Sequence, residues 1–231
     1  MTVSEEILAG TDTMSTYVTQ PASPAAEMNL LDMCMQGGWL MIPLLALSIV
    51  SIYILIERAL VLRRASAEDA TFMHRIRDYI HSGQLDSARN LCRATGTPYA
   101  RLIEKGISRI GRPMNDVLVA IENTGNIEVS RLEKGLPWLA TTASGAPMLG
   151  FLGTVIGMVK AFYEIASAGS ASNITTFADG IYTALVTTVA GLIVGVIALF
   201  AYNYLVARIN RVMTNLESKT MEFMDLLNEP A

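Results

Sequence analysis

Three long apolar stretches without a charged side chain constrain this 231-residue chain more than any other feature of its sequence. A helix that crosses a membrane needs about 20 mostly apolar residues, and a charge at its centre costs about 2.5 to 3.5 kcal/mol on insertion scales. With 52% hydrophobic and only 16% charged residues, the chain is too apolar for an ordinary soluble domain. The sequence therefore predicts an all-α integral membrane protein with three transmembrane helices, at residues 33–57, 135–160 and 180–207.

The positive charges indicate how the chain is oriented. No Lys or Arg precedes Arg58, and 13 of the 17 basic residues lie between Arg58 and Lys134. Basic connections stay in the cytoplasm, and the connection between the second and third spans contains no basic residue. The sequence therefore predicts an outer N-terminal segment (1–32), a cytoplasmic helical domain (58–134), a short outer loop (161–179) and a cytoplasmic helical tail (208–231).

The cytoplasmic segments show apolar residues at helical spacing, which predicts a bundle of short helices in 58–134. Turns that separate these helices are expected at Gly83, Gly96 and Gly111. The same spacing continues from Ile209 to Leu227, so the third span is expected to extend far into the cytoplasm as a helix.

The N-terminal segment is too poor in apolar residues to fold alone, and we expect it to be largely flexible, with a short interfacial helix at 29–35. It carries no basic residue and so lacks the pattern of a cleaved signal peptide. Cys34 lies at the start of the first span and Cys92 lies beyond its end, so the two cysteines are expected to face opposite compartments and not to form a disulfide.

Small residues line the second and third spans. Gly153, Gly157 and Ala161 form one ridge along a helix face, and Gly191 and Gly195 form another. Such ridges let two helix backbones approach closely. We interpret the four glycines as helix-packing positions at contacts between subunits, whereas the first span, which is mostly Leu, Ile and Val, is expected to face lipid.

Hydroxyl residues in the same two spans are the candidate functional positions. Thr154 in the second span and Thr183, Thr187 and Thr188 in the third are candidates for a pore lining or proton pathway, because a hydroxyl both donates and accepts hydrogen bonds. Alternatively, each hydroxyl bonds to the carbonyl four residues back in its own helix and has no bearing on transport. Apart from Glu57 and Lys160, which close the first and second spans, the spans contain no Asp, Glu, His, Lys or Arg, so another chain would have to supply the titratable group that a proton relay needs.

No pattern in the sequence predicts an enzyme. It contains no Gly-rich phosphate loop, no His pair with metal-ligand spacing and no nucleophile elbow. We therefore expect no catalytic residue, no cofactor and no metal site, and the clustered positive charge is explained by membrane topology, not by nucleic-acid binding.

Two runs of sequence carry a resemblance to a known family. One extends from Ala146 to Met158 in the second span, and the other from Gly180 to Leu192 in the third. Both resemble the ExbB/TolQ/MotA family of bacterial proton-channel stator subunits, most closely its ExbB branch. Further similarity lies at both ends of the first span and in the segment 83–88, so the resemblance covers 37–208.

The resemblance implies a pentameric ring in the bacterial inner membrane, with the N-terminus in the periplasm and the C-terminus in the cytoplasm. The second and third spans would surround the single membrane helices of an ExbD-like partner, whose aspartate carries the proton. Thr154 and Thr188 match pore-facing threonines of the family, whereas Thr183 stands where many members carry a glutamate. The implied function couples the proton-motive force to TonB-type import across the outer membrane, through a TonB-like energy transducer.

Three alternatives remain at the level of sequence. A TolQ-like motor of the cell envelope has the same motifs. A structural scaffold with this fold but no transport is favoured by the absence of a membrane carboxylate. A channel that works without a partner fits poorly, since the chain alone would have no group in its spans to couple proton movement to work.

Overall fold

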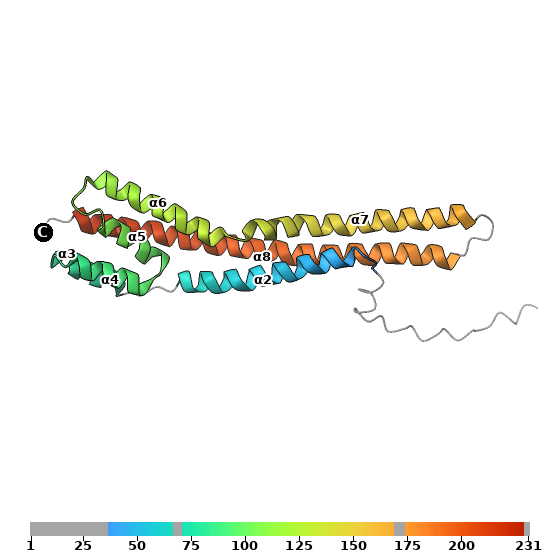
Figure 1. Ribbon diagram of the computed structural model, residues 1–231, viewed down its shortest axis with the longest axis horizontal. Coiled ribbons are helices and arrows are strands. Elements are labelled where there is room, and N and C mark those ends of the chain that lie inside the picture. Colours follow the sequence, from blue (N-terminus) through green and yellow to red (C-terminus); the bar gives the residue numbers. More distant parts are fainter. Residues whose placement is uncertain (1–36, 67–70, 169–173, 229–231) are drawn as a thin grey trace, which may run out of the picture.

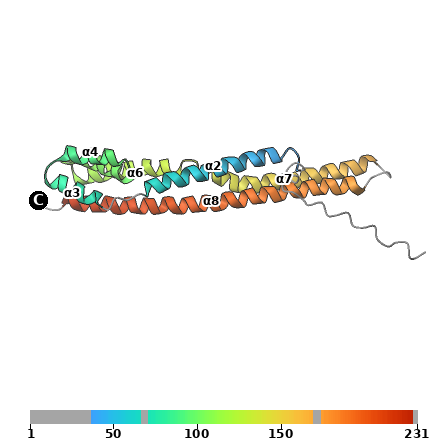
Figure 2. The same ribbon diagram turned by 90° about the horizontal axis from the view of Figure 1, so that it is seen from below.

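The computed structural model describes residues 37–66, 71–168 and 174–228, and within them the chain forms an elongated bundle of helices (Figure 1). One helix runs along most of the molecule, two shorter ones lie beside parts of it, and short helices gather at the end that holds the C-terminus (Figures 1 and 2). In chain order the helices are α2 (Met41–Ala65), α3 (Phe72–His81), α4 (Leu85–Thr95), α5 (Pro98–Ile107), α6 (Met114–Glu133), α7 (Leu136–Ala168) and α8 (Ile174–Asn228).

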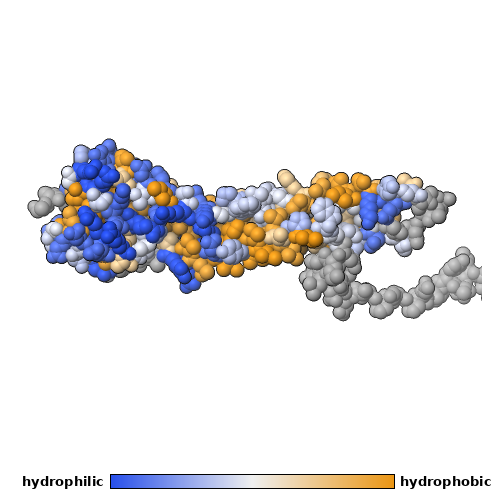
Figure 3. All heavy atoms as spheres, viewed as in Figure 1, coloured by the Kyte–Doolittle hydropathy of each residue, from blue (hydrophilic) through white to orange (hydrophobic). Residues whose placement is uncertain are grey.

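The three predicted spans fall in α2, α7 and α8, and each of these segments is long and apolar enough to cross a membrane. α7 and α8 form an antiparallel hairpin, and α2 packs mainly along α8. Exposed apolar side chains cover the outside of this region, where Figure 3 shows an orange band between two bluer ends. On α2 this outer face includes Ile42, Leu45 and Tyr53, whereas Leu44 and Ile54 are buried.

The helices do not end where the charge-free stretches end. α2 begins only at Met41, after a turn in which Gly38 has a φ of 71°, so the part of the predicted span at 37–40 is not helical. Residues 33–36 and the predicted interfacial helix lie outside the described residues. The predicted loop at 161–179 is largely helix, because α7 continues to Ala168 and α8 starts at Ile174. Charge marks the edge of a membrane but does not stop a helix.

Where the predicted second span ends, the hairpin of α7 and α8 is held by its own contacts. Lys160 and Glu164 are one turn apart on α7, with 3.9 Å between Nζ and Oε1. The rings of Phe162 and Phe177 pack edge to face across the two helices, 5.8 Å between centroids. These contacts allow α7 and α8 to continue past the apolar spans as a two-helix extension.

The predicted helical bundle is confirmed in α3 to α6. Gly83, Gly96 and Gly111 adopt left-handed φ values of 71°, 64° and 91° between consecutive helices, as expected for turns that other residues rarely adopt. The third span also continues as predicted, because α8 runs unbroken for 55 residues, about 80 Å at 1.5 Å per residue. Its last turns insert Phe223 into the core of the bundle.

A buried carboxylate joins the bundle to the base of the membrane region. Glu128 on α6 has a side chain only 4% exposed and accepts from Arg101 at 2.5 Å and from Arg131 at 2.7 Å. The carbonyl of Arg131 in turn accepts from the Arg58 guanidinium of α2 at 3.0 Å. Because α6 ends at Glu133, two residues before a turn in which Gly135 has a φ of 90°, this network fixes the direction in which α7 leaves the bundle.

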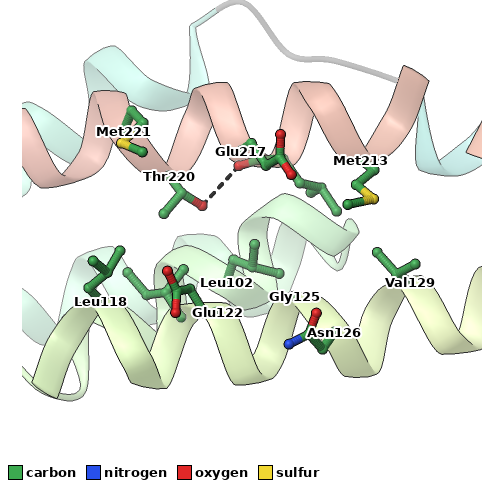
Figure 4. Close-up of a pocket in the computed structure, with 12 residues that line it drawn as sticks. Leu102, Leu118, Glu122, Gly125, Asn126, Val129, Met213, Glu217, Thr220 and Met221 are labelled. Carbon is green, nitrogen blue, oxygen red and sulfur yellow. Dashed lines mark hydrogen bonds between the residues drawn. The ribbon is translucent and has the colours of Figure 1, made fainter. Parts of the chain in front are cut away.

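Two glycines in the bundle provide a matched test of its packing. A methyl group at Gly106 would lie 2.4 Å from the Phe223 ring, which is fully buried, whereas one at Gly125 would meet only Leu102 at 3.7 Å. Gly125 lies in an open groove of about 260 Å³ between α6 and α8 (Figure 4). We expect Gly106→Ala to destabilise the protein by about 1–3 kcal/mol through overpacking. Gly125→Ala should stabilise it by up to about 1 kcal/mol through helix propensity.

Thermal unfolding of both variants, followed by circular dichroism in detergent, measures these opposite effects. Equal changes in the melting temperatures of the two variants would contradict the contacts described for Gly106 and Gly125.

Cys92 on α4 is fully buried, and this burial, reinforced by the negative charge of Glu104, raises the pKa of its thiol from 9.0 to about 12. The thiolate is the reactive form. We therefore expect a Cys34→Ser variant, which keeps Cys92 as its only thiol, to resist iodoacetamide at pH 8 and to react upon unfolding. Because the unfolded chain loses its thiol proton first, stability should fall as the pH rises from about 9 towards 12. Rapid labelling of the folded protein at pH 8 would show that the Cys92 thiol is accessible and would contradict the prediction.

Candidate proton pathway between the second and third spans

The interface between α7 and α8 is a close contact of two backbones. A methyl group at Gly191 would lie 2.6 Å from the carbonyl oxygen of Ala146 and 2.9 Å from Cα of Gly150. At Gly195 it would lie 2.5 Å from the ring of Pro147. The α8 ridge predicted from the sequence therefore packs against α7 of the same chain.

The α7 ridge faces α8 in the same way. A methyl group at Gly153 would lie 2.6 Å from Cγ2 of Thr187, and one at Gly157 would lie 2.7 Å from Cβ of Ala184. The interpretation of these ridges as contacts between subunits is corrected by these distances. Helical spacing shows that small residues share one face of a helix, but it cannot tell whether the helix packed against that face belongs to the same chain.

This close approach brings two candidate hydroxyls together. Thr154 of α7 and Thr188 of α8 are hydrogen-bonded to each other through their Oγ1 atoms. Thr188 Oγ1 also donates to the carbonyl of Gly150 at 3.0 Å, across the interface, and Thr154 Oγ1 lies 3.5 Å from the carbonyl of Ala184. Both threonines are partly exposed, so this hydroxyl pair, Thr154 with Thr188, is within reach of a group outside the hairpin.

The other two candidates lie differently. Thr187 is only 2% exposed, and its hydroxyl donates to the carbonyl of Thr183 at 2.8 Å and lies 3.4 Å from that of Gly37. A side chain buried within one chain does not fit the predicted place in a pore lining, and its packing against Gly153 instead supports the helix interface. Thr183 is partly buried one turn away, at the start of the same face.

Hydroxyls elsewhere in α7 bond within their own helix, which is the alternative given above for the candidate threonines. Thr141, Thr142 and Ser144 each donate to the carbonyl four residues back, at 2.8, 2.9 and 3.2 Å. These bonds satisfy the hydroxyls within one helix. The hydroxyls of Thr154 and Thr188 also lie 3.4 Å from the carbonyls four residues back in their own helices. Their bond to each other, however, crosses from one helix to the other, and helical spacing alone could not reveal it.

A hydroxyl pair can pass a proton or orient a water, but it cannot hold a charge near neutral pH. The charge-free stretches of the spans, 33–56, 135–159 and 180–207, contain no Asp, Glu, His, Lys or Arg. The arrangement therefore suits a site that a titratable group approaches from outside the hairpin.

The fold and this site define a multi-pass membrane protein with three candidate spans and a polar contact between two of them. Residues 94–218 match the sequence family described as the MotA/TolQ/ExbB proton channel family. The chain belongs to this family, which consists of membrane proton channels and is not a class of enzymes.

Individual relatives support this assignment. An ExbB-like biopolymer transport protein of Synechocystis is 31% identical over 84% of this chain and 74% of its own length. The Tol-Pal system protein TolQ of Haemophilus influenzae is 30% identical over 89% of this chain and 96% of its own. The biopolymer transport protein ExbB of Neisseria meningitidis is 31% identical over 70% of this chain and 78% of its own.

Proposed function

We propose that the chain is an ExbB-like stator subunit that converts the proton-motive force into mechanical work for TonB-type import across the outer membrane. It forms a pentameric ring in the inner membrane, with its N-terminus in the periplasm and its C-terminus in the cytoplasm. An ExbD-like protein with one membrane helix occupies the ring and brings the aspartate that carries the proton. A TonB-like transducer delivers the work.

The observation that carries this proposal is the hydroxyl pair. Thr154 and Thr188 bridge the two helices, remain partly exposed and have no ionisable residue beside them in the spans. A protonated carboxyl group that moves past such a site exchanges hydrogen bonds with the hydroxyls and is spared full desolvation. One proton that crosses 100 mV releases about 2.3 kcal/mol, which is enough to bias a movement of the partner within the ring.

A TolQ-like motor is the second candidate. The match to the Haemophilus TolQ extends over 89% of this chain and 96% of the relative, whereas the match to the Neisseria ExbB covers 70% and 78%. The two identities are similar, 30% and 31%, so overall similarity supports both branches. Both candidates share the ring, the partner and the proton step, and they differ in the envelope process that receives the work.

Native mass spectrometry after co-expression with the neighbouring gene tests the ring and the partner, which both candidate functions share. We expect a complex of five copies of this chain with one or two copies of a single-span protein that has an aspartate in its membrane helix. A ring or monomer that never retains such a partner would favour the structural scaffold. Rescue of iron-siderophore uptake, compared with rescue of outer-membrane integrity, in strains that lack their own ExbB or TolQ would then decide between the two branches.

A further inference from the structure

A pocket of about 560 Å³ opens between α2 and α8 just beyond the apolar parts of both helices. Its volume lies within the range of small-molecule sites. From α2 and the residue that follows it, and from α8, the lining residues are Ala59, Leu60, Leu62, Arg63, Ser66, Tyr204 and Arg208. The two helices run side by side at this point in both views of the ribbon (Figures 1 and 2).

The pocket lies at the depth of lipid headgroups. The charge-free stretches end at Ile56 on α2 and at Ala207 on α8, so Arg208 is the first charge after its span. Arg63 follows Ile56 by about 10 Å along the helix, at 1.5 Å per residue. Headgroups occupy roughly the first 5 to 8 Å beyond the hydrocarbon core on each side. The two guanidiniums therefore flank the layer in which lipid phosphates reside.

The two positive charges in this pocket have no acidic partner among the residues that the structure describes. Within the described ranges, neither Arg63 nor Arg208 forms an ion pair, whereas the nearby Arg58 is paired with Glu57 at 2.9 Å. Tyr204 positions Arg208 instead: the guanidinium carbon lies 5.6 Å from its ring centre, and Nε lies 3.3 Å from its hydroxyl. That contact uses one of the five N–H donors of the guanidinium.

We propose that this pocket binds the headgroup of an anionic phospholipid. Its phosphate would lie between Arg63 and Arg208, whose planar guanidiniums suit phosphate oxygens, with the Ser66 hydroxyl as a further donor. Leu60, which is 55% exposed, and Leu62 provide an apolar floor for the first carbons of the lipid. Two unpaired cations favour a headgroup with net negative charge, such as phosphatidylglycerol, over a zwitterionic one, whose ammonium they would repel.

Such a lipid would join α2 to α8 at the base of the membrane region. This role does not depend on proton transfer, and it holds equally if the chain is an ExbB-like motor, a TolQ-like motor or a scaffold. The site concerns only the basic ends of the first and third spans, far along the helices from the hydroxyl pair.

Native mass spectrometry of the full chain tests the proposal. The protein is delipidated in mild detergent and supplied with phosphatidylglycerol or with phosphatidylcholine of the same chain length. We expect about tenfold more bound phosphatidylglycerol, and about a tenfold loss in the Arg63→Gln, Arg208→Gln double variant, as expected when charge-assisted hydrogen bonds are removed. The matched control is Arg64→Gln with Arg211→Gln, which removes the same charge from exposed neighbours outside the pocket lining.

Each other outcome would overturn the proposal. An equal loss in the control pair would show that general surface charge attracts the lipid, and equal binding of the two lipids would exclude selection by charge. Displacement of the lipid by a small excess of glycerol 3-phosphate would assign the pocket to a soluble phosphate instead. Both arginines are at the surface, so the variants should fold. If circular dichroism shows a loss of helix in the double variant, Arg63→Gln alone decides by the same criteria.

Discussion

Replacing Gly191 by alanine is expected to separate α7 from α8 and to destabilise the membrane region by about 1–3 kcal/mol or more, the usual range for overpacking in a tight core. The added methyl group would lie 2.6 Å from the carbonyl of Ala146 and 2.9 Å from Cα of Gly150. Both neighbours are backbone atoms, so no side chain can move aside, and the helices themselves must shift. The shift would also pull Thr154 away from Thr188, which bond across the same interface.

The control for this variant is Gly145→Ala on α7, because a methyl group there would have nothing within 4 Å. Unfolding of the detergent-solubilised protein exposes the buried Cys92 thiol. In the Cys34→Ser background, a thiol-reactive dye therefore reports unfolding during heating. We expect a clearly lower melting temperature for Gly191→Ala and an unchanged or higher one for Gly145→Ala. Equal melting temperatures would mean that the interface is looser than these contacts indicate.

The same distances change what Gly157→Leu should do. If this ridge lay between subunits, as interpreted from the sequence, a bulky residue there would separate them, but Gly157 packs on Ala184 of its own chain. The primary effect is therefore expected within the hairpin, as a loss of monomer stability. Any change in oligomer size on gel filtration would follow from that loss.

Much of the fold could be predicted because membrane spans leave a strong signal. Charge-free length located α2, α7 and α8, and glycine turns separated the short helices of the bundle. The ends of the helices could not be predicted in this way. Charge at Glu57 or Lys160 reports the membrane boundary, whereas a helix stops only where backbone hydrogen bonding or turn geometry changes. α2 and α7 therefore continue past both charges.

The candidate site was predicted only in part. Helical spacing identified the threonines, and family similarity singled out Thr154 and Thr188, but neither showed that these two bond to each other. By helical spacing alone Thr187 was indistinguishable from them, although the structure buries it behind Gly153. The missing information is the rotation of α8 relative to α7, which depends on packing distances between two helices that no single-helix pattern contains.

The Thr154→Val, Thr188→Val double variant should lose most proton-coupled activity while keeping its assembly. Valine has nearly the shape of threonine, so the packing of α7 on α8 is preserved, but both hydroxyls of the pair are removed. A positioned group that handles a proton typically contributes a factor of about 10² to 10⁴ to the rate. We expect at least about a tenfold loss of proton flux in liposomes that hold the complex with its single-span partner.

Two further variants separate proton handling from packing. Thr141→Val removes an exposed hydroxyl that bonds only to the carbonyl of Pro137, and it should leave flux unchanged. Thr187→Val removes the buried hydroxyl bonded to Thr183, and it should lower thermal stability more than flux. If instead the double variant assembles and retains full flux, the pair is a packing contact and the scaffold becomes the better account. If all three variants lose flux in proportion to their stability, the threonines serve the fold, and the path of the proton lies elsewhere in the complex.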